Sequence, residues 1–249
     1  IKYSCYALGA KPNIDYISSR DFEKGEGPST GAATTGGLSK LSSYDGILVP
    51  GGFGETGIDG KLKVIQYARE NKIPYFGLCY GMQLMTVEYA RNVAGLAGAH
   101  TTEIDPKTPN PVIAILPEQV EKLAKKNYGG TMRLGAYPCV LQEGSIAADA
   151  YFGAGSKLKT ENSKLIHERH RHRYEINPKY IERLEKAGLV FSGRSPDGIL
   201  MEIAELPKSV HPFFLGTQFH PEFLARPLAP HKLFDAFIRA SVERRGTRQ

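Results

Sequence analysis

The segments GILVPGGFG (residues 46–54) and IPYFGLCYGMQ (residues 73–83) decide the fold of this 249-residue chain. Each contains a short apolar run that ends in glycines, which is typical of a buried strand followed by a tight loop. Apolar residues recur at helical spacing in KLKVIQYARE (61–70) and again over residues 83–93. Strand and helix therefore alternate, which predicts parallel strands joined by crossover helices in an open α/β sheet.

The chain beyond residue 110 has a different texture, with short β-rich runs and turn signals. The predicted elements are β-rich runs at 111–116, 137–141 and 164–176, a helix at 179–187, a hairpin of 190–194 with 199–204 around Ser-Pro-Asp-Gly, a last core strand at 213–219 and a closing helix at 231–245. Residues 25–39, rich in Gly, Ser and Thr, are expected to form a mobile surface loop. We expect an α/β fold with an open, mostly parallel central sheet flanked by helices and an added small β-rich subsheet.

Composition excludes several classes of protein. The net charge is +6, but no helix-turn-helix, zinc-finger or RNA-recognition pattern accompanies it, so no nucleic-acid partner is expected. No run approaches the roughly 20 apolar residues of a membrane span. Only three cysteines occur, at 5, 79 and 139, without the spacing of a metal site or a disulfide framework. We therefore expect no metal site, no membrane contact and a cytoplasmic location.

Cys79 is the candidate nucleophile. It lies between a predicted strand and a predicted helix, with Gly77 and Gly81 two positions to either side, which is the pattern of a nucleophile elbow. The helix that follows is expected to lower the pKa of the thiol. The alternative is a buried core cysteine, which is the usual environment of a free thiol.

A Cys-His-Glu triad is predicted from the QFHPE segment at 218–222, which follows the last core strand. In an extended segment residues two apart point the same way, so Glu222 can bond one ring nitrogen of His220 while the other faces the sulfur. A satisfied core histidine is the alternative. The developing oxyanion needs N–H donors, expected from Tyr80 and from the glycine loop at 51–54, where Gly52 is assigned. That loop could instead be a plain turn or a phosphate cradle, but the Lys-Ser/Thr of a P-loop is missing.

Together, PGGFG, GLCYGMQ and HPE resemble the class I, triad-type glutamine amidotransferases. The resemblance is narrower in AHTTEIDP (99–106), GGTMRLG (129–135), ERHRHRYEINP (168–178), FSGRSPDG (191–198) and QFHPEFLARP (218–227), which are similar to the glutaminase domain of the CTP synthase family. This resemblance covers nearly all of the chain after residue 44. It assigns catalysis to Cys79, His220 and Glu222.

The same resemblance assigns the binding of L-glutamine to a further set of residues. These are Gly52, Tyr80, Gly81, Met82, Gln83, Glu103 and Arg173. Charge supports two of them, because glutamine is a zwitterion: the Glu103 carboxylate suits its ammonium and the Arg173 guanidinium suits its carboxylate. A solvated loop acid and a surface cation are the respective alternatives. Tyr80 stands where relatives usually carry leucine, which would alter the pocket wall but leave the backbone donor in place.

The resemblance implies a ligase reaction in which this chain carries the glutaminase half. Glutamine would be hydrolysed through a γ-glutamyl thioester, and ammonia would pass to a synthetase domain that aminates UTP to CTP with ATP and Mg²⁺, in pyrimidine nucleotide biosynthesis. GTP would activate the full enzyme allosterically, and a homotetramer is implied. Residues 1–249 are expected to be this one domain without the synthetase domain and shortened at its N-terminal strand, since Ile1 to Ala10 is expected to begin inside the first helix.

Two other functions stay open. A free-standing γ-glutamyl cysteine hydrolase could share the elbow and the His-x-Glu pair, although GGTMRLG and RHRHRYE argue against it. A non-catalytic glutamine-sensing module would carry a decayed site, whereas the three triad residues are all present here.

Overall fold

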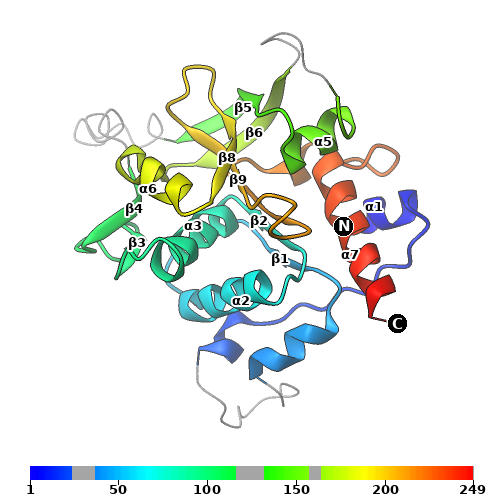
Figure 1. Ribbon diagram of the computed structural model, residues 1–249, viewed down its shortest axis with the longest axis horizontal. Coiled ribbons are helices and arrows are strands. Elements are labelled where there is room, and N and C mark those ends of the chain that lie inside the picture. The colour runs from blue at the N-terminus through cyan, green and yellow to red at the C-terminus, as the bar shows by residue number, and fades with distance from the viewer. Residues whose placement is uncertain (24–36, 116–131, 157–163, 249) are drawn as a thin grey trace.

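The computed structural model describes residues 1–23, 37–115, 132–156 and 164–248 (Figure 1). Its elements in chain order are α1 (Lys2–Ala7), η1 (Ser19–Phe22), η2 (Gly37–Ser43), β1 (Ile47–Val49), α2 (Ile58–Glu70), β2 (Tyr75–Leu78), α3 (Tyr80–Asn92), β3 (Ala99–Thr101), β4 (Asn110–Ala114), β5 (Arg133–Leu141), α5 (Ile146–Phe152), β6 (Leu165–His172), β7 (Glu175–Ile176), η5 (Pro178–Tyr180), α6 (Ile181–Lys186), β8 (Val190–Arg194), β9 (Met201–Glu205), β10 (Phe214–Thr217), η6 (Pro221–Phe223) and α7 (Lys232–Thr247). None of the helices in these ranges is both long enough and apolar enough to span a bilayer.

The central sheet has the strand order β1-β2-β10-β9-β8-β5-β6. The α/β class and the flanking helices are confirmed, with one correction: the sheet is mixed rather than mostly parallel. Among the described strands of this sheet, the β1–β2 and β2–β10 pairs are parallel and the other four pairs are antiparallel. The difference follows the connections: the crossover helix α2 joins β1 to β2 in parallel, whereas a tight turn joins β8 to β9 as antiparallel neighbours.

Two helical layers cover the two faces of this sheet (Figure 1). Side chains of α2 and α3 pack in one core cluster with Tyr75 and Phe214, and side chains of α1, α5 and α7 pack in another with Phe76 and Leu215. Tyr75 and Phe76 are neighbours on β2, and successive strand residues point to opposite faces. Every residue of β2 and β10 is therefore buried, which explains their continuous apolar sequences.

The added small sheet is confirmed and has the order β3-β4-β7. A second correction applies here: residues 164–176 do not form a single β-rich run, because β6 belongs to the large sheet and β7 to the small one. The chain changes sheets at Arg173 and Tyr174. Leu116 and most of the predicted loop at 25–39 lie outside the described residues, and Gly37 to Ser39 begin η2.

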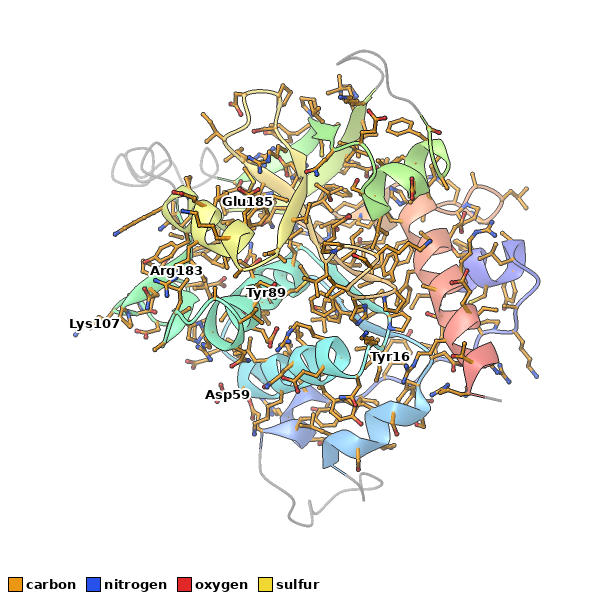
Figure 2. The ribbon with its side chains drawn as sticks, in the orientation of Figure 1. Tyr16, Asp59, Tyr89, Lys107, Arg183 and Glu185 are labelled. Atoms are coloured by element: carbon orange, nitrogen blue, oxygen red, sulfur yellow. The ribbon has the colours of Figure 1, made fainter. Side chains whose placement is uncertain are left out.

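The predicted C-terminal elements are confirmed with small shifts in their ends. β8 and β9 pair antiparallel around a turn in which the Gly198 N–H donates to the Ser195 carbonyl. The predicted helix at 179–187 is a 3₁₀ turn followed by α6. The end of α3 is tied to α6, because Tyr89 donates to the Ala187 carbonyl and Arg183 to the carbonyls of residues 94 and 95 (Figure 2).

Candidate active site

Cys79 lies on a strained turn between β2 and α3, as the sequence predicts. Its φ is +48° and its ψ −97°, in a region that residues with side chains rarely adopt. The flanking glycines are required by space. A Cβ on Gly77 would lie 2.7 Å from the backbone carbon of Gly81, and a Cβ on Gly81 would lie 2.3 Å from the Val49 carbonyl oxygen. The elbow therefore depends on close approach of three backbone segments.

The thiol of Cys79 is only 5% exposed, and its environment opposes ionisation. Burial raises the pKa of the thiol to about 12, and the charges of Glu222 and Glu175 act in the same direction. Hydrogen bonds from the Tyr80 backbone N–H and the Gln218 side chain act in the opposite direction. The prediction of a lowered thiol pKa is wrong for this resting state, because desolvation of the sulfur outweighs the N–H groups at the start of α3. A base must therefore remove the proton.

His220 is placed to be that base. Its Nδ1 lies 2.6 Å from Glu222 Oε1, and its Nε2 is buried with no hydrogen-bond partner among the described residues. A carboxylate accepts from Nδ1–H, which leaves Nε2 as the basic nitrogen. Phe223 stacks on the imidazole with ring centroids 4.6 Å apart and planes 8° apart, which fixes the ring orientation. The pairing is as predicted, but its geometry is not extended, because Glu222 stands on the 3₁₀ turn η6.

The glycine loop at 51–54 brings the histidine and the cysteine to one place. An atom at the Cβ position of Gly51 would lie 2.7 Å from His220 Cε1 and 3.7 Å from Cys79 Cβ. The side chains of both predicted catalytic residues therefore border Gly51, although 141 residues separate them in the sequence. Only a glycine leaves room for this approach.

The predicted oxyanion donors lie on the same loop and at the start of α3. A Cβ on Gly52 would lie 3.6 Å from the Tyr80 ring, and the Tyr80 hydroxyl donates to the Gly54 carbonyl at 2.8 Å. The Gly54 N–H in turn donates to Glu103 Oε1 at 3.0 Å. Burial and the Glu103 charge raise the pKa of the Tyr80 hydroxyl, so it is a neutral donor. Tyr80 and Glu103 thus hold the loop beside Cys79.

Glu103 and Arg173 supply opposite charges near the same tyrosine. Burial and the Glu103 charge raise the pKa of Tyr174, and the Arg173 charge lowers it. The two charges therefore act on Tyr174 from different segments, one after β3 and one between β6 and β7. This separation of charge suits an amino acid zwitterion.

The residues of the predicted glutamine-binding segment 80–83 differ in their surroundings. Gly81 packs against the Val49 carbonyl, and the Met82 side chain is fully buried beneath Gly216. Gln83 is buried and donates from Nε2 to the Tyr174 carbonyl at 3.0 Å. The Met82 side chain therefore faces the sheet, so any contact of this residue with a ligand would come from its backbone.

A buried cluster of charged and titratable side chains around Arg133 was not predicted from the sequence. Arg133 bonds Glu175 at 3.2 Å and Glu202 at 2.8 Å, and His170 bonds His172 at 3.0 Å. Burial raises the pKa of Glu175 to about 8. The signal available in the sequence was the two-residue spacing of His170 and His172, which places both on one face of a strand. In β6 that face is the buried one. Among the described residues, no group of three or more His, Cys, Asp or Glu side chains is arranged to hold a metal ion.

Comparison with known proteins gives one consistent result. Residues 2–240 match the family described as glutamine amidotransferase class-I. Two proteins named CTP synthase, from Halalkalibacterium halodurans and Bacillus licheniformis, are 48% and 54% identical to it over 98% of this chain, which spans 41% of the length of each.

Solved structures agree in fold. The structure titled Trypanosoma brucei CTPS glutaminase domain with bound acivicin is 35% identical, with a TM-score of 0.80, and the match covers 97% of this chain and 85% of that one. A Thermoplasma acidophilum protein described as part of a GMP synthase is 16% identical, with a TM-score of 0.56 over 98% of this chain and 88% of that one. This second likeness concerns the fold alone.

Proposed function

The chain belongs to the class-I glutamine amidotransferase family, and on that premise we propose that it is a glutaminase domain that supplies ammonia to the synthetase part of a CTP synthase. One observation supports the chemistry above all others. The His220 imidazole is held by Glu222 through Nδ1, its buried Nε2 has no partner among the described residues, and the ring and Cys79 both border Gly51. This is the arrangement of a thiol, a base and an orienting carboxylate.

Acylation begins when His220 Nε2 takes the proton of the Cys79 thiol and Sγ attacks the side-chain carbonyl carbon of glutamine. The new S–C bond places a negative charge on the carbonyl oxygen, which accepts from the N–H groups of Gly52 and Tyr80. Collapse of this intermediate breaks the C–N bond. The nitrogen leaves as ammonia with the proton from His220, and a γ-glutamyl thioester remains on the sulfur.

Deacylation uses the same groups with water as the nucleophile. His220 takes a proton from the water, whose oxygen attacks the thioester carbon, and the S–C bond then breaks as the proton returns to Sγ. Glutamate is released and the thiol is regenerated. Glu222 orients the ring and stabilises the imidazolium in both halves. No cofactor is needed for either half.

The remaining assignments rest on the likeness to the CTP synthases. We assign glutamine binding to Glu103 and Arg173, with the segment 80–83. ATP, Mg²⁺ and UTP belong to the synthetase part, where amination of UTP gives CTP; GTP is proposed as an allosteric activator and a homotetramer as the assembly. A cytoplasmic location is proposed because all three cysteines are free thiols.

The test is glutamine hydrolysis by the purified chain. We expect equal amounts of glutamate and ammonia, formed slowly by this chain alone, with the activity abolished in Cys79→Ser. Cys5→Ser is the matched control, because Cys5 is also a buried free thiol but lies on α1. Cleavage of γ-glutamyl peptides without any glutamine hydrolysis would instead support the free-standing hydrolase.

A further inference from the structure

A line of three polar groups connects the sulfur of Cys79 to the backbone of β6–β7. Gln218 is fully buried, and its Nε2 lies 3.7 Å from Cys79 Sγ. Its Oε1 accepts from Gln83 Nε2 at 3.3 Å. Gln83 Nε2 also donates to the Tyr174 carbonyl at 3.0 Å. The line therefore runs from a fixed carbonyl, through two amides, to the nucleophile.

The Tyr174 carbonyl determines how the two amide groups are oriented. A backbone carbonyl can only accept, so Gln83 must turn its NH₂ group toward Tyr174. The second N–H of that group then points to an acceptor, which is the Gln218 oxygen. Turning the Gln218 amide around would place two donors face to face and leave an oxygen against the sulfur. Gln218 is therefore held with its N–H toward Cys79.

We propose that Gln218 is a further catalytic residue, whose side-chain N–H stabilises the Cys79 thiolate and whose orientation is fixed by Gln83. This inference rests on the proposed function for its role in turnover. A neutral N–H donor gains most when its acceptor carries a full charge, so the bond is stronger to the thiolate than to the thiol or the thioester. The bond therefore favours the reactive state over the states before and after it.

The need for such a donor follows from the surroundings of the sulfur. Cys79 has little access to water, and the Glu222 carboxylate opposes a negative charge on it, as does Glu175 when it is ionised. The Tyr80 backbone N–H donates to the sulfur at the start of α3, and the Gln218 amide adds a donor from the end of β10. Two donors from separate elements thus compensate part of the lost hydration, although desolvation remains the larger effect.

The alternative role for Gln218 is packing, because its side chain is fully buried. Its backbone N–H donates to the Glu202 carbonyl, and this bond does not involve the side chain. A packing role needs only the volume of the side chain. Gln218→Met keeps most of that volume and removes the donor, and Gln218→Glu keeps the shape but turns an acceptor toward the sulfur. Gln66→Met is the matched control, because the Gln66 amide bonds Glu70 on the surface of α2.

The test measures alkylation of Cys79 by iodoacetamide between pH 6 and 9, followed by peptide mass spectrometry. In this reaction the sulfur loses its proton and displaces iodide, so the rate reports how readily the thiolate forms, with His220 present in every variant. It requires neither glutamine binding nor turnover. We expect Gln218→Met to lower the rate about 10- to 100-fold at each pH. We expect Gln218→Glu to lower it further and Gln66→Met to match the wild type.

Alkylation of folded Gln218→Met at the wild-type rate across this range would overturn the proposal and leave Gln218 a packing residue. Should Gln218→Met fail to fold, Gln218→Glu and Gln83→Met carry the same comparison, because Gln83→Met releases the amide that holds Gln218. A wild-type chain that hydrolyses no glutamine would refute the proposed function, while the alkylation rates would still decide the role of Gln218.

Discussion

Replacing His220 by alanine should make the reactivity of Cys79 depend on the small amount of thiolate that forms without a base. The pKa of the buried thiol is about 12, so at pH 7 only about one molecule in 10⁵ carries a thiolate. In the proposed mechanism, His220 takes the proton as the sulfur attacks, so the wild-type rate should not be limited to that fraction. His220→Ala should therefore lose about 10⁴- to 10⁵-fold at pH 7.

The pH dependence separates this cause from simple misfolding. Below a pKa of about 12, the thiolate fraction rises tenfold with each pH unit. His220→Ala should follow that slope from pH 7 to 10, so its deficit relative to the wild type should shrink steadily as the pH rises. A misfolded variant would show no such recovery.

The assay is the rate at which acivicin, the compound bound in the T. brucei structure, modifies Cys79, followed by mass spectrometry. His167→Ala is the matched control, because His167 is an exposed histidine on β6. A His220→Ala rate within tenfold of the wild type at pH 7, or one independent of pH, would refute the role of His220 as the base.

Three further predictions concern the elbow, the substrate charge and the buried carboxyl. Gly81→Ala should destabilise the fold by about 1–3 kcal/mol through overpacking. Gly246→Ala, in open space on α7, should instead stabilise the fold by up to about 1 kcal/mol. Urea unfolding measures the free energy of unfolding of both variants. Glu103→Gln keeps an acceptor for the glycine loop but removes the charge, so KM for glutamine should rise about 10- to 100-fold with kcat little changed; a fall in kcat alone would contradict the assignment. Burial raises the pKa of Glu175 in the folded state to about 8, above the ordinary value of 4.5. The unfolded chain therefore loses this proton more readily, so the contribution of Glu175 to folding stability is full below about pH 4.5 and is lost as the pH rises to about 8. Glu175→Gln should therefore lose less stability than the wild type between pH 5 and 8 in urea unfolding, whereas exposed Glu143→Gln should not differ from it.

The parts of the site that the sequence predicted are those set by local geometry. The elbow follows from glycines placed two residues to either side of Cys79, and the His-Glu pair lies within three residues of chain. Both are confirmed as structural features. The first two strands and their helices were also predictable, because hydrophobic periodicity is a local property.

The features that escaped prediction depend on distant segments. Burial of the thiol comes from the assembled fold, so its raised pKa has no signal near Cys79. The line from Gln218 through Gln83 to Tyr174 joins three segments that are far apart in the sequence. The β8–β9 hairpin was predicted, but the other antiparallel pairs of the sheet were missed because short β-rich runs do not reveal their partners.

The role of Cys79 as the nucleophile of a glutamine-specific site is tested most directly by mass spectrometry of the chain after exposure to acivicin, with and without excess glutamine. We expect that one equivalent modifies Cys79, that glutamine protects it, and that Cys5 and Cys139 stay unmodified. Modification of those two cysteines instead, or no protection by glutamine, would contradict this role.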